Sequence, residues 1–214
     1  MKEEALKELE TQLKNCRECK LCEFAKGPVG WFGCADTPIV FVGEGPGGVE
    51  DDYGCPLIGP SGQLLDKALW ATKMTRDRVI TTNVVKCRPK GNRTPNIAEA
   101  DFCAQRWLDK ELAILQPKVV VALGSVALHY LGNPDMRITR DRGKWFKTRQ
   151  GFDCIATYHP AYLLRLADPH VVNHAKWEVF YDLEAARKKA EEAVPDYKFM
   201  SEEKTNLFKL FTKR

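Results

Sequence analysis

The sequence predicts an α/β protein, a three-layer α/β/α sandwich around a central parallel sheet of four strands. Runs of apolar and β-branched residues cover 39–42, 79–82, 119–123 and 154–157, and runs without alternation of apolar and charged residues are typical of strands buried on both faces. Helical patterns separate these runs, and a repeated order of strand then helix is typical of a parallel sheet covered on both sides. A length of 214 residues and a hydrophobic content of 44% suit one well-buried core.

The helices are predicted from their apolar stripes and their boundary residues. Leu6, Leu9 and Leu13 lie on one face of an N-terminal helix. Ser61 is expected to cap the helix after the first strand, because a serine side chain satisfies free N–H groups at a helix start. The expected helices cover residues 2–15, 61–73, 97–115 and 172–193, and a further short helix is expected to start at 124–125.

One domain is expected over residues 1–194, with 195–214 as a charged C-terminal extension. The extension carries scattered aromatic residues, so it is either loosely held or an interaction tail. No apolar stretch of signal-peptide length opens the chain, and no run approaches the ~20 apolar residues that cross a bilayer. The protein is therefore expected to be cytoplasmic and without membrane contact. A monomer is also expected.

Polar side chains follow three of the predicted strands directly. Gly43-Glu44-Gly45-Pro46-Gly47 follows the first strand, Asn83 follows the second, and His159-Pro160-Ala161-Tyr162-Leu163-Leu164-Arg165 follows the fourth. The carboxyl ends of parallel strands meet at one edge of the sheet, where ligands bind in open α/β folds. A carboxylate, an amide and an imidazole are therefore expected in one cleft.

Basic residues gather around this expected cleft, although the formal net charge is only +4. A polyanion such as a nucleic acid could lie across them. The residues concerned are Lys86, Arg88, Lys90, Arg93, Arg137, Arg140, Arg142, Lys144, Lys147, Arg149 and Arg165.

Eight cysteines are many for a reducing compartment, where disulfides rarely persist, so metal binding is favoured for some of them. Cys16 and Cys19 form a Cys-x2-Cys pair, and Cys87 and Cys103 are separated by fifteen residues. Four thiolates suit zinc or an iron–sulfur cluster equally, and Cys22 could replace Cys16. Of the others, Cys154 reads as a core residue and Cys55 could line the pocket.

Taken together, these segments resemble the family 4 uracil-DNA glycosylases, in order from about residue 10 to about residue 190. The matching segments are Cys16-x2-Cys19, Gly43 to Gly47, Glu50-Asp51, Gly59-Pro60-Ser61-Gly62, Asn83 to Pro89, Cys103 and His159 to Arg165. The resemblance implies a uracil-DNA glycosylase-like fold and a structural [4Fe–4S] cluster on Cys16, Cys19, Cys87 and Cys103. It also implies a DNA repair enzyme that hydrolyses the N-glycosidic bond of uracil in single- or double-stranded DNA and leaves an abasic site.

The resemblance assigns roles to residues of the predicted cleft. Asn83 would pair with the Watson–Crick edge of an extruded uracil, His159 would donate to uracil O2, and Glu44 would hold the attacking water. Substrate-binding positions are Gly43, Gly45, Gly47, Leu57 and Asn83. Each polar residue also has a structural alternative, as a loop cap, a strand-end donor or a turn residue.

The histidine segment and a basic loop would contact the DNA. Either Leu163 or Leu164 would be the apolar wedge in the minor groove, next to Tyr162, with Arg165 on phosphate. Arg140 and Arg142 would touch the DNA backbone. The alternative is that residues 162–164 begin a buried turn.

The chain departs from the family at Leu57, where most members carry a phenylalanine that stacks on uracil. Stacking of a base on an aromatic ring is worth ~1–3 kcal/mol, and Tyr53 lies close enough in sequence to compensate. Two alternatives therefore stay open: a glycosylase for another deaminated base, and a catalytically weak iron–sulfur DNA-binding domain associated with replication. No lysine lies beside either motif as a Schiff-base nucleophile, so strand cleavage is not expected.

Overall fold

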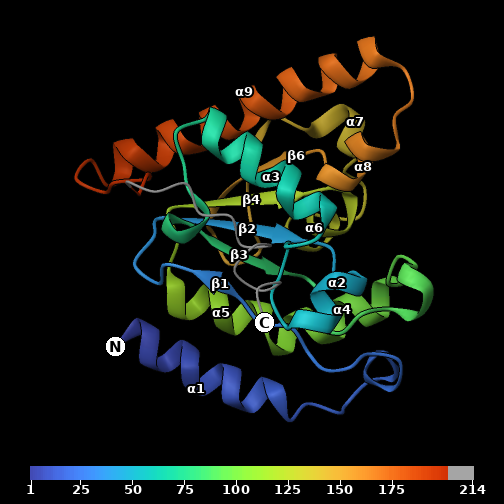
Figure 1. Ribbon diagram of the computed structural model, residues 1–214. Helices are drawn as coiled ribbons and strands as arrows, with labels where there is room; N and C mark the ends of the chain where they lie inside the picture. The colour runs from blue at the N-terminus through green and yellow to red at the C-terminus, as the bar shows by residue number, and fades with distance from the viewer. Residues whose placement is uncertain (202–214) are drawn as a thin grey trace.

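The computed structural model describes residues 1–201 of the chain. Within that range a six-stranded sheet of order β1-β3-β2-β4-β6-β5 lies between two layers of helices (Figure 1). The inner strands β3 (Ile80–Asn83), β2 (Ile39–Gly43), β4 (Val119–Leu123) and β6 (Asp153–Thr157) are parallel to one another. The predicted α/β sandwich around a parallel four-stranded sheet is confirmed.

Two short edge strands extend this sheet beyond the prediction. Strand β1 (Phe32–Gly33) pairs with β3, strand β5 (Trp145–Lys147) pairs with β6, and both pairings are antiparallel. Strands of two and three residues carry too little pattern to be recognised in a sequence. They cover the edges of the parallel sheet, which would otherwise present unpaired backbone groups.

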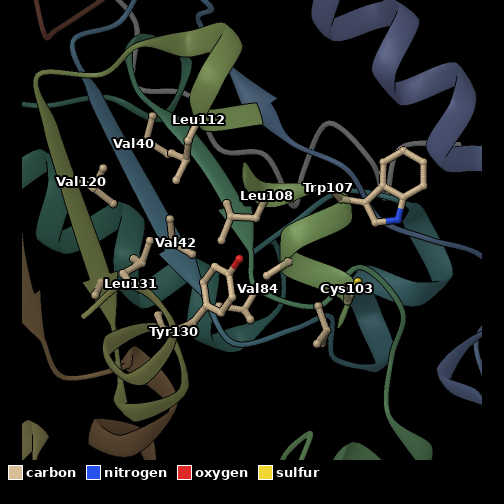
Figure 2. Packing of buried hydrophobic residues seen from close by; sticks show 14 of the residues in the cluster. Val40, Val42, Val84, Cys103, Trp107, Leu108, Leu112, Val120, Tyr130 and Leu131 are labelled. Carbon is tan, nitrogen blue, oxygen red and sulfur yellow. The ribbon is translucent and has the colours of Figure 1, made fainter. Parts of the chain in front are cut away.

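One face of the sheet is covered by α1 (Lys2–Lys14), α4 (Ile97–Arg106), α5 (Leu108–Leu115) and α6 (Ser125–Leu131). Figure 2 shows the core on this face, where Val40, Val42 and Val120 of the sheet meet helix residues such as Leu112. The single helix expected over 97–115 is two helices, because the backbone leaves helical geometry at Trp107 (φ −122°, ψ −58°).

The other face is covered by α3 (Pro60–Ala71), α8 (Pro160–Arg165) and α9 (Pro169–Ala193), with α3 and α9 lying together in Figure 1. Helix α3 begins one residue earlier than expected. Its N-cap is Gly59 and Pro60 is its first residue, so Ser61 is not the cap. Proline suits this position because its missing N–H would be unpaired there in any case.

The remaining elements are short and lie in the connections. They are α2 (Gly48–Tyr53), α7 (Ile138–Asp141) and the 3-10 turns Lys20–Glu23, Arg76–Arg78 and Lys90–Asn92. None of the helices within residues 1–201 is both long and apolar enough to cross a membrane.

The described part of the segment expected as a C-terminal extension packs against the body of the protein. The backbone N–H of Thr75 donates to the carbonyl of Phe199 at 2.9 Å, and the Tyr197 hydroxyl donates to the carbonyl of Arg78 at 2.7 Å. Phe199 is buried in the core beneath α3 and α9. The rest of the extension, 202–214, lies outside the described residues.

Candidate active site

A cavity of about 540 Å³ opens at the carboxyl ends of β2 and β6. Glu44 and His159 both line it, although more than a hundred residues separate them in sequence. Leu57, Tyr162 and Arg165 also line this cavity. The structure thus brings together side chains that the sequence placed at one sheet edge.

His159 follows β6 and caps α8 with its own side chain. Its Nδ1 accepts a hydrogen bond from the Ala161 N–H at 3.1 Å, so a neutral ring carries its proton on Nε2. Burial, together with the charge of Arg165, lowers the pKa of His159 to about 4. At neutral pH the residue is therefore a neutral imidazole with one N–H to donate.

Gly124 gives the histidine its room. Its backbone has φ +86°, and a Cβ at this position would lie 2.8 Å from the Cβ of His159. Both the left-handed backbone and the close approach require glycine. The turn between β4 and α6 and the histidine segment therefore fit together only with glycine here.

Glu44 follows β2 and Gly43 directly, and its carbonyl accepts the N–H of Val85 at 3.1 Å. Burial raises the pKa of the Glu44 carboxyl, while a hydrogen bond from Thr94 and the charge of Arg165 oppose this rise. A carboxylate held in a partly dry cavity interacts strongly with any positive charge that develops nearby.

Asn83 is the most informative residue of the site. Its side chain is 1% exposed, and neither its Oδ1 nor its Nδ2 has a hydrogen-bond partner among the described residues. Leaving a buried polar group unpaired costs about 1–3 kcal/mol. An amide with both ends unpaired at the carboxyl end of a strand is therefore typical of a ligand-binding group.

Gly43 lies against the Asn83 amide, and neither residue is among those that line the cavity. It is opposite Asn83 in the pairing of β2 with β3, and a Cβ at Gly43 would lie 2.4 Å from Asn83 Oδ1 and 3.7 Å from Leu57 Cδ1. Any larger residue would fill the space in front of the amide. Gly45 and Gly47 line the cavity itself.

Leu57 lines the cavity in a strained conformation, with φ +54°. Its carbonyl points at Gly62, where a Cβ would lie 1.6 Å from the Leu57 oxygen. Non-glycine residues in the left-handed region cost free energy and are frequent at functional sites. Tyr53, which could have compensated for the missing aromatic ring, is exposed and is not among the residues that line the cavity.

Glu50 was noted in the sequence only as part of a motif, yet it organises the loops of the site. Its buried carboxylate accepts the N–H groups of Gly47 at 3.1 Å, Ile58 at 3.0 Å and Gly59 at 2.7 Å. The loop after β2 is thereby held against the Leu57 loop. A glutamate three residues after a helix N-cap, here Gly47, was the signal available in the sequence.

The histidine segment is only partly exposed. Leu163 is 5% exposed and packs into the core, whereas Leu164 is 52% exposed. Of the two wedge candidates, Leu164 is the one whose side chain is exposed, and Leu163 lies on the buried side of α8. Tyr162 and Arg165 face the cavity.

Arg142, which was expected to touch the DNA backbone, makes ion pairs within the protein. Its guanidinium donates to both carboxylate oxygens of Asp182 at 2.8 and 3.0 Å and to Glu178 at 2.7 Å. This network fixes the loop after α7 to α9 and uses the donors that a phosphate would need. Arg140 pairs with the neighbouring Asp141 but keeps its side chain exposed.

Lys86, counted among the cations of the cleft edge, is buried instead. Its side chain is 1% exposed, and its Nζ donates to Glu111 at 2.8 Å and to Thr82 at 2.6 Å. The Thr82 hydroxyl donates in turn to Glu111 at 2.7 Å. This network ties the end of β3 to α5.

Five cysteines gather at the end of the core below β3, on three separate segments. Cys16 follows α1, Cys19 precedes the 3-10 turn Lys20–Glu23 and Cys22 lies within it, Cys87 follows β3, and Cys103 lies on α4. Burial, and to a smaller extent the other thiols of the group, raise the pKa of Cys87 to about 12 and that of Cys103 to about 11. The N–H of Lys86 donates to Cys103 Sγ at 3.2 Å.

The cysteine group contains both ligand sets that the sequence left open, with Cys16 or with Cys22. All eight cysteines are free thiols. Within the described part of the chain, no three His, Cys, Asp or Glu side chains are arranged around a point where one metal ion would sit. Cys154 is fully buried in β6, as predicted, while Cys55 is buried beside Ile58 and is absent from the residues that line the cavity.

Comparison with known proteins places this geometry in a family. The sequence pattern of the "Uracil DNA glycosylase superfamily" matches residues 31–184. A type-4 uracil-DNA glycosylase of Thermotoga maritima is 38% identical over 87% of this chain and 95% of the relative. The corresponding protein of Pyrobaculum aerophilum is 38% identical over 75% and 85%, and that of Archaeoglobus fulgidus 36% identical over 75% and 84%.

Proposed function

This chain belongs to the type-4 uracil-DNA glycosylases of the uracil DNA glycosylase superfamily, and we propose that it hydrolyses the N-glycosidic bond of uracil in DNA, leaving an abasic site. The observation that carries the proposal is the buried, unpaired amide of Asn83. The amide is reached past Gly43 and Leu57, and Leu57 lines the cavity together with Glu44 and His159. Such a site suits a base that has left the helix stack.

Asn83 would select the base. Its Oδ1 would accept from uracil N3–H, and its Nδ2 would donate to uracil O4. Cytosine presents an acceptor at N3 and a donor at N4, so both ends of the amide would stay unpaired. A site built to hydrogen-bond one base rejects another because buried groups lose their partners.

His159 and Glu44 would act on opposite charges as the bond breaks. The Nε2–H of the neutral imidazole would donate to uracil O2, where negative charge develops, and backbone N–H groups of the 45–48 loop would add to this stabilisation. The Glu44 carboxylate would stabilise the cationic sugar and hold the water that attacks it. No covalent link to the protein is needed, so a monofunctional enzyme follows.

The DNA would contact the histidine segment, residues 159–165. The substrate would be single- or double-stranded DNA, and the enzyme would act as a monomer. Leu164 would fill the space left by the extruded base, and Arg165 and the exposed Arg140 would contact phosphate. The cost of extrusion is lower for an unpaired base. Single-stranded DNA is therefore the simplest first substrate.

The cysteine group would hold a [4Fe–4S] cluster through Cys16, Cys19, Cys87 and Cys103, with Cys22 as the alternative to Cys16. The residues fit such a group, because thiolates are its usual ligands and because the Lys86 N–H already donates to Cys103 Sγ. When bound, the cluster would supply a structural link between the end of α1, the segment after β3 and α4.

The test is a single-turnover assay on a labelled single-stranded oligonucleotide with one uracil, treated with alkali afterwards to cut abasic sites. Cleavage at the uracil position only is the expected result. No cleavage by protein that shows the absorption of an iron–sulfur cluster would contradict the proposal. Leu57 makes another deaminated base the second candidate, so matched oligonucleotides with hypoxanthine and xanthine belong in the same experiment.

A further inference from the structure

We propose that Tyr158 and Tyr162 form an aromatic platform on which the base next to the excised uracil stacks. The inference rests on the proposed function and adds a second base-binding subsite to it. It starts from the observation that Tyr158 and Tyr162 are the aromatic side chains that line the cavity within the described residues.

The two rings are in contact with each other in a tilted arrangement. Their centroids lie 4.9 Å apart with an interplanar angle of 35°, within the range that aromatic pairs prefer. Both residues are half-buried, so one ring supports the other while part of the surface stays open to the cavity. A base has a π-face whatever its identity, and aromatic residues bind single strands in this sequence-tolerant way.

The platform is braced from behind. The Arg142 guanidinium lies over the Tyr158 ring, 5.5 Å from its centroid, and is itself held by Glu178 and Asp182 of α9. A cation over an aromatic face stabilises the ring's position. Because the rings are ordered before DNA arrives, little further conformational entropy is lost on binding.

The position of the platform favours a neighbouring base over the uracil itself. Asn83, Gly43 and Leu57 belong to the β2 and β3 side of the site, whereas the tyrosines flank His159 on the β6 side. Cavities of several hundred Å³ enclose ligands larger than one base, so space remains after a uracil is bound. Tyr162 also precedes the exposed Leu164 and Arg165, along which the strand would run.

A double-mutant cycle between protein and DNA tests the platform. The probes are single-stranded oligonucleotides with one uracil, in which the base on its 5′ or its 3′ side is replaced by a stable abasic residue. For the wild-type protein, kcat/KM is expected to fall by about tenfold when the stacked base is missing. On the complete strand, Tyr162→Leu is expected to have a kcat/KM about tenfold below that of the wild-type protein. On the strand that lacks the stacked base, the variant and the wild-type protein are expected to have the same kcat/KM.

The controls separate the possible outcomes. Tyr181→Leu removes a tyrosine of α9 that is 59% exposed and absent from the cavity lining, and it should keep the wild-type response to the missing base. Tyr162→Phe retains a ring and should retain the coupling. The inference would be overturned if the losses from Tyr162→Leu and from the missing base were additive at both flanking positions. It would also be overturned if Tyr162→Leu and the wild-type protein had equal kcat/KM on the complete strand. Failure of the wild-type protein to release uracil would instead overturn the proposed function.

Discussion

The two walls of the cavity are held in place by different kinds of interaction. The β2/β3 wall, which carries Glu44 and Asn83, is fixed by buried groups: Val84 N–H donates to the Gly43 carbonyl at 2.9 Å, and Lys86 pairs with Glu111 out of contact with water. The β6 wall, which carries Tyr158 to Arg165, is braced by Arg142 and its half-buried ion pairs to α9.

The difference teaches where each wall is vulnerable. A buried ion pair is costly to break, because the remaining charge has no water to solvate it, whereas pairs that reach solvent contribute less. Segment 83–87 also joins the Asn83 amide, which is proposed to recognise uracil, to a cysteine of the proposed cluster within five residues. A substitution in the β2/β3 wall should therefore lower the stability of the whole fold. A substitution in the β6 wall should remove one contact and leave the fold intact.

The largest effect is expected from breaking the β2/β3 wall at Lys86. Lys86→Met leaves Glu111 buried without its cation, and the free energy of unfolding should fall by about 3–5 kcal/mol. Denaturant unfolding followed by circular dichroism measures this change. Lys188→Met, which removes an exposed pair with Glu184 on α9, is the matched control and should change stability by less than about 1 kcal/mol. Equal losses in the two variants would show that the wall does not depend on the buried pair.

The β6 wall should lose chemistry rather than stability when its histidine is removed. His159→Ala should slow single-turnover uracil release by about 10²–10³-fold, because one preorganised donor to the leaving group is lost. DNA affinity, measured by fluorescence anisotropy, should change little. A variant that turns over at the wild-type rate would remove His159 from the reaction.

Asn83→Asp should change base selection on the β2/β3 wall. A protonated aspartate can donate its O–H to cytosine N3 and accept from cytosine N4–H, which the amide cannot do in its uracil-binding orientation. The preference for uracil over cytosine should therefore weaken by about tenfold, the equivalent of one hydrogen bond. The ratio of single-turnover rates on uracil and cytosine oligonucleotides measures it. An unchanged ratio would mean that Asn83 does not read the base edge.

The smallest effect concerns a contact across the cavity, from Thr94 to Glu44. Activity should fall as the pH drops through the raised pKa of Glu44, because the carboxylate is the active form; His159 adds nothing above its pKa of about 4. Thr94→Val removes a hydrogen bond that lowers the pKa of Glu44, so the acidic limb of the rate profile should move to higher pH. Thr139→Val, at another threonine of the cavity, should leave the limb in place. A limb that moves to lower pH would contradict this assignment.

The parts of the fold that could be predicted from the sequence are those with a local signal. The inner strands are continuous apolar runs, and the motifs follow them directly, so their meeting at one edge could be inferred. The edge strands β1 and β5 and the break at Trp107 escaped prediction, because they depend on pairing and packing with distant segments.

The same reason explains which site residues were assigned differently by the structure. Arg142 and Lys86 both read as exposed cations, but their carboxylate partners lie 40 and 25 residues away. Leu163 and Leu164 are adjacent and alike in the sequence, and only the packing of α8 distinguishes them. The absence of a partner for the Asn83 amide is likewise a property of the folded chain.

The most direct test of the account is to identify the base that the protein releases. A pool of single-stranded oligonucleotides that carry uracil, cytosine, hypoxanthine or xanthine at one position would be incubated with the protein, and the free bases measured by mass spectrometry. Free uracil without the other three is the result that the Asn83 and His159 geometry predicts. Release of hypoxanthine or xanthine in place of uracil, or of no base at all, would contradict it.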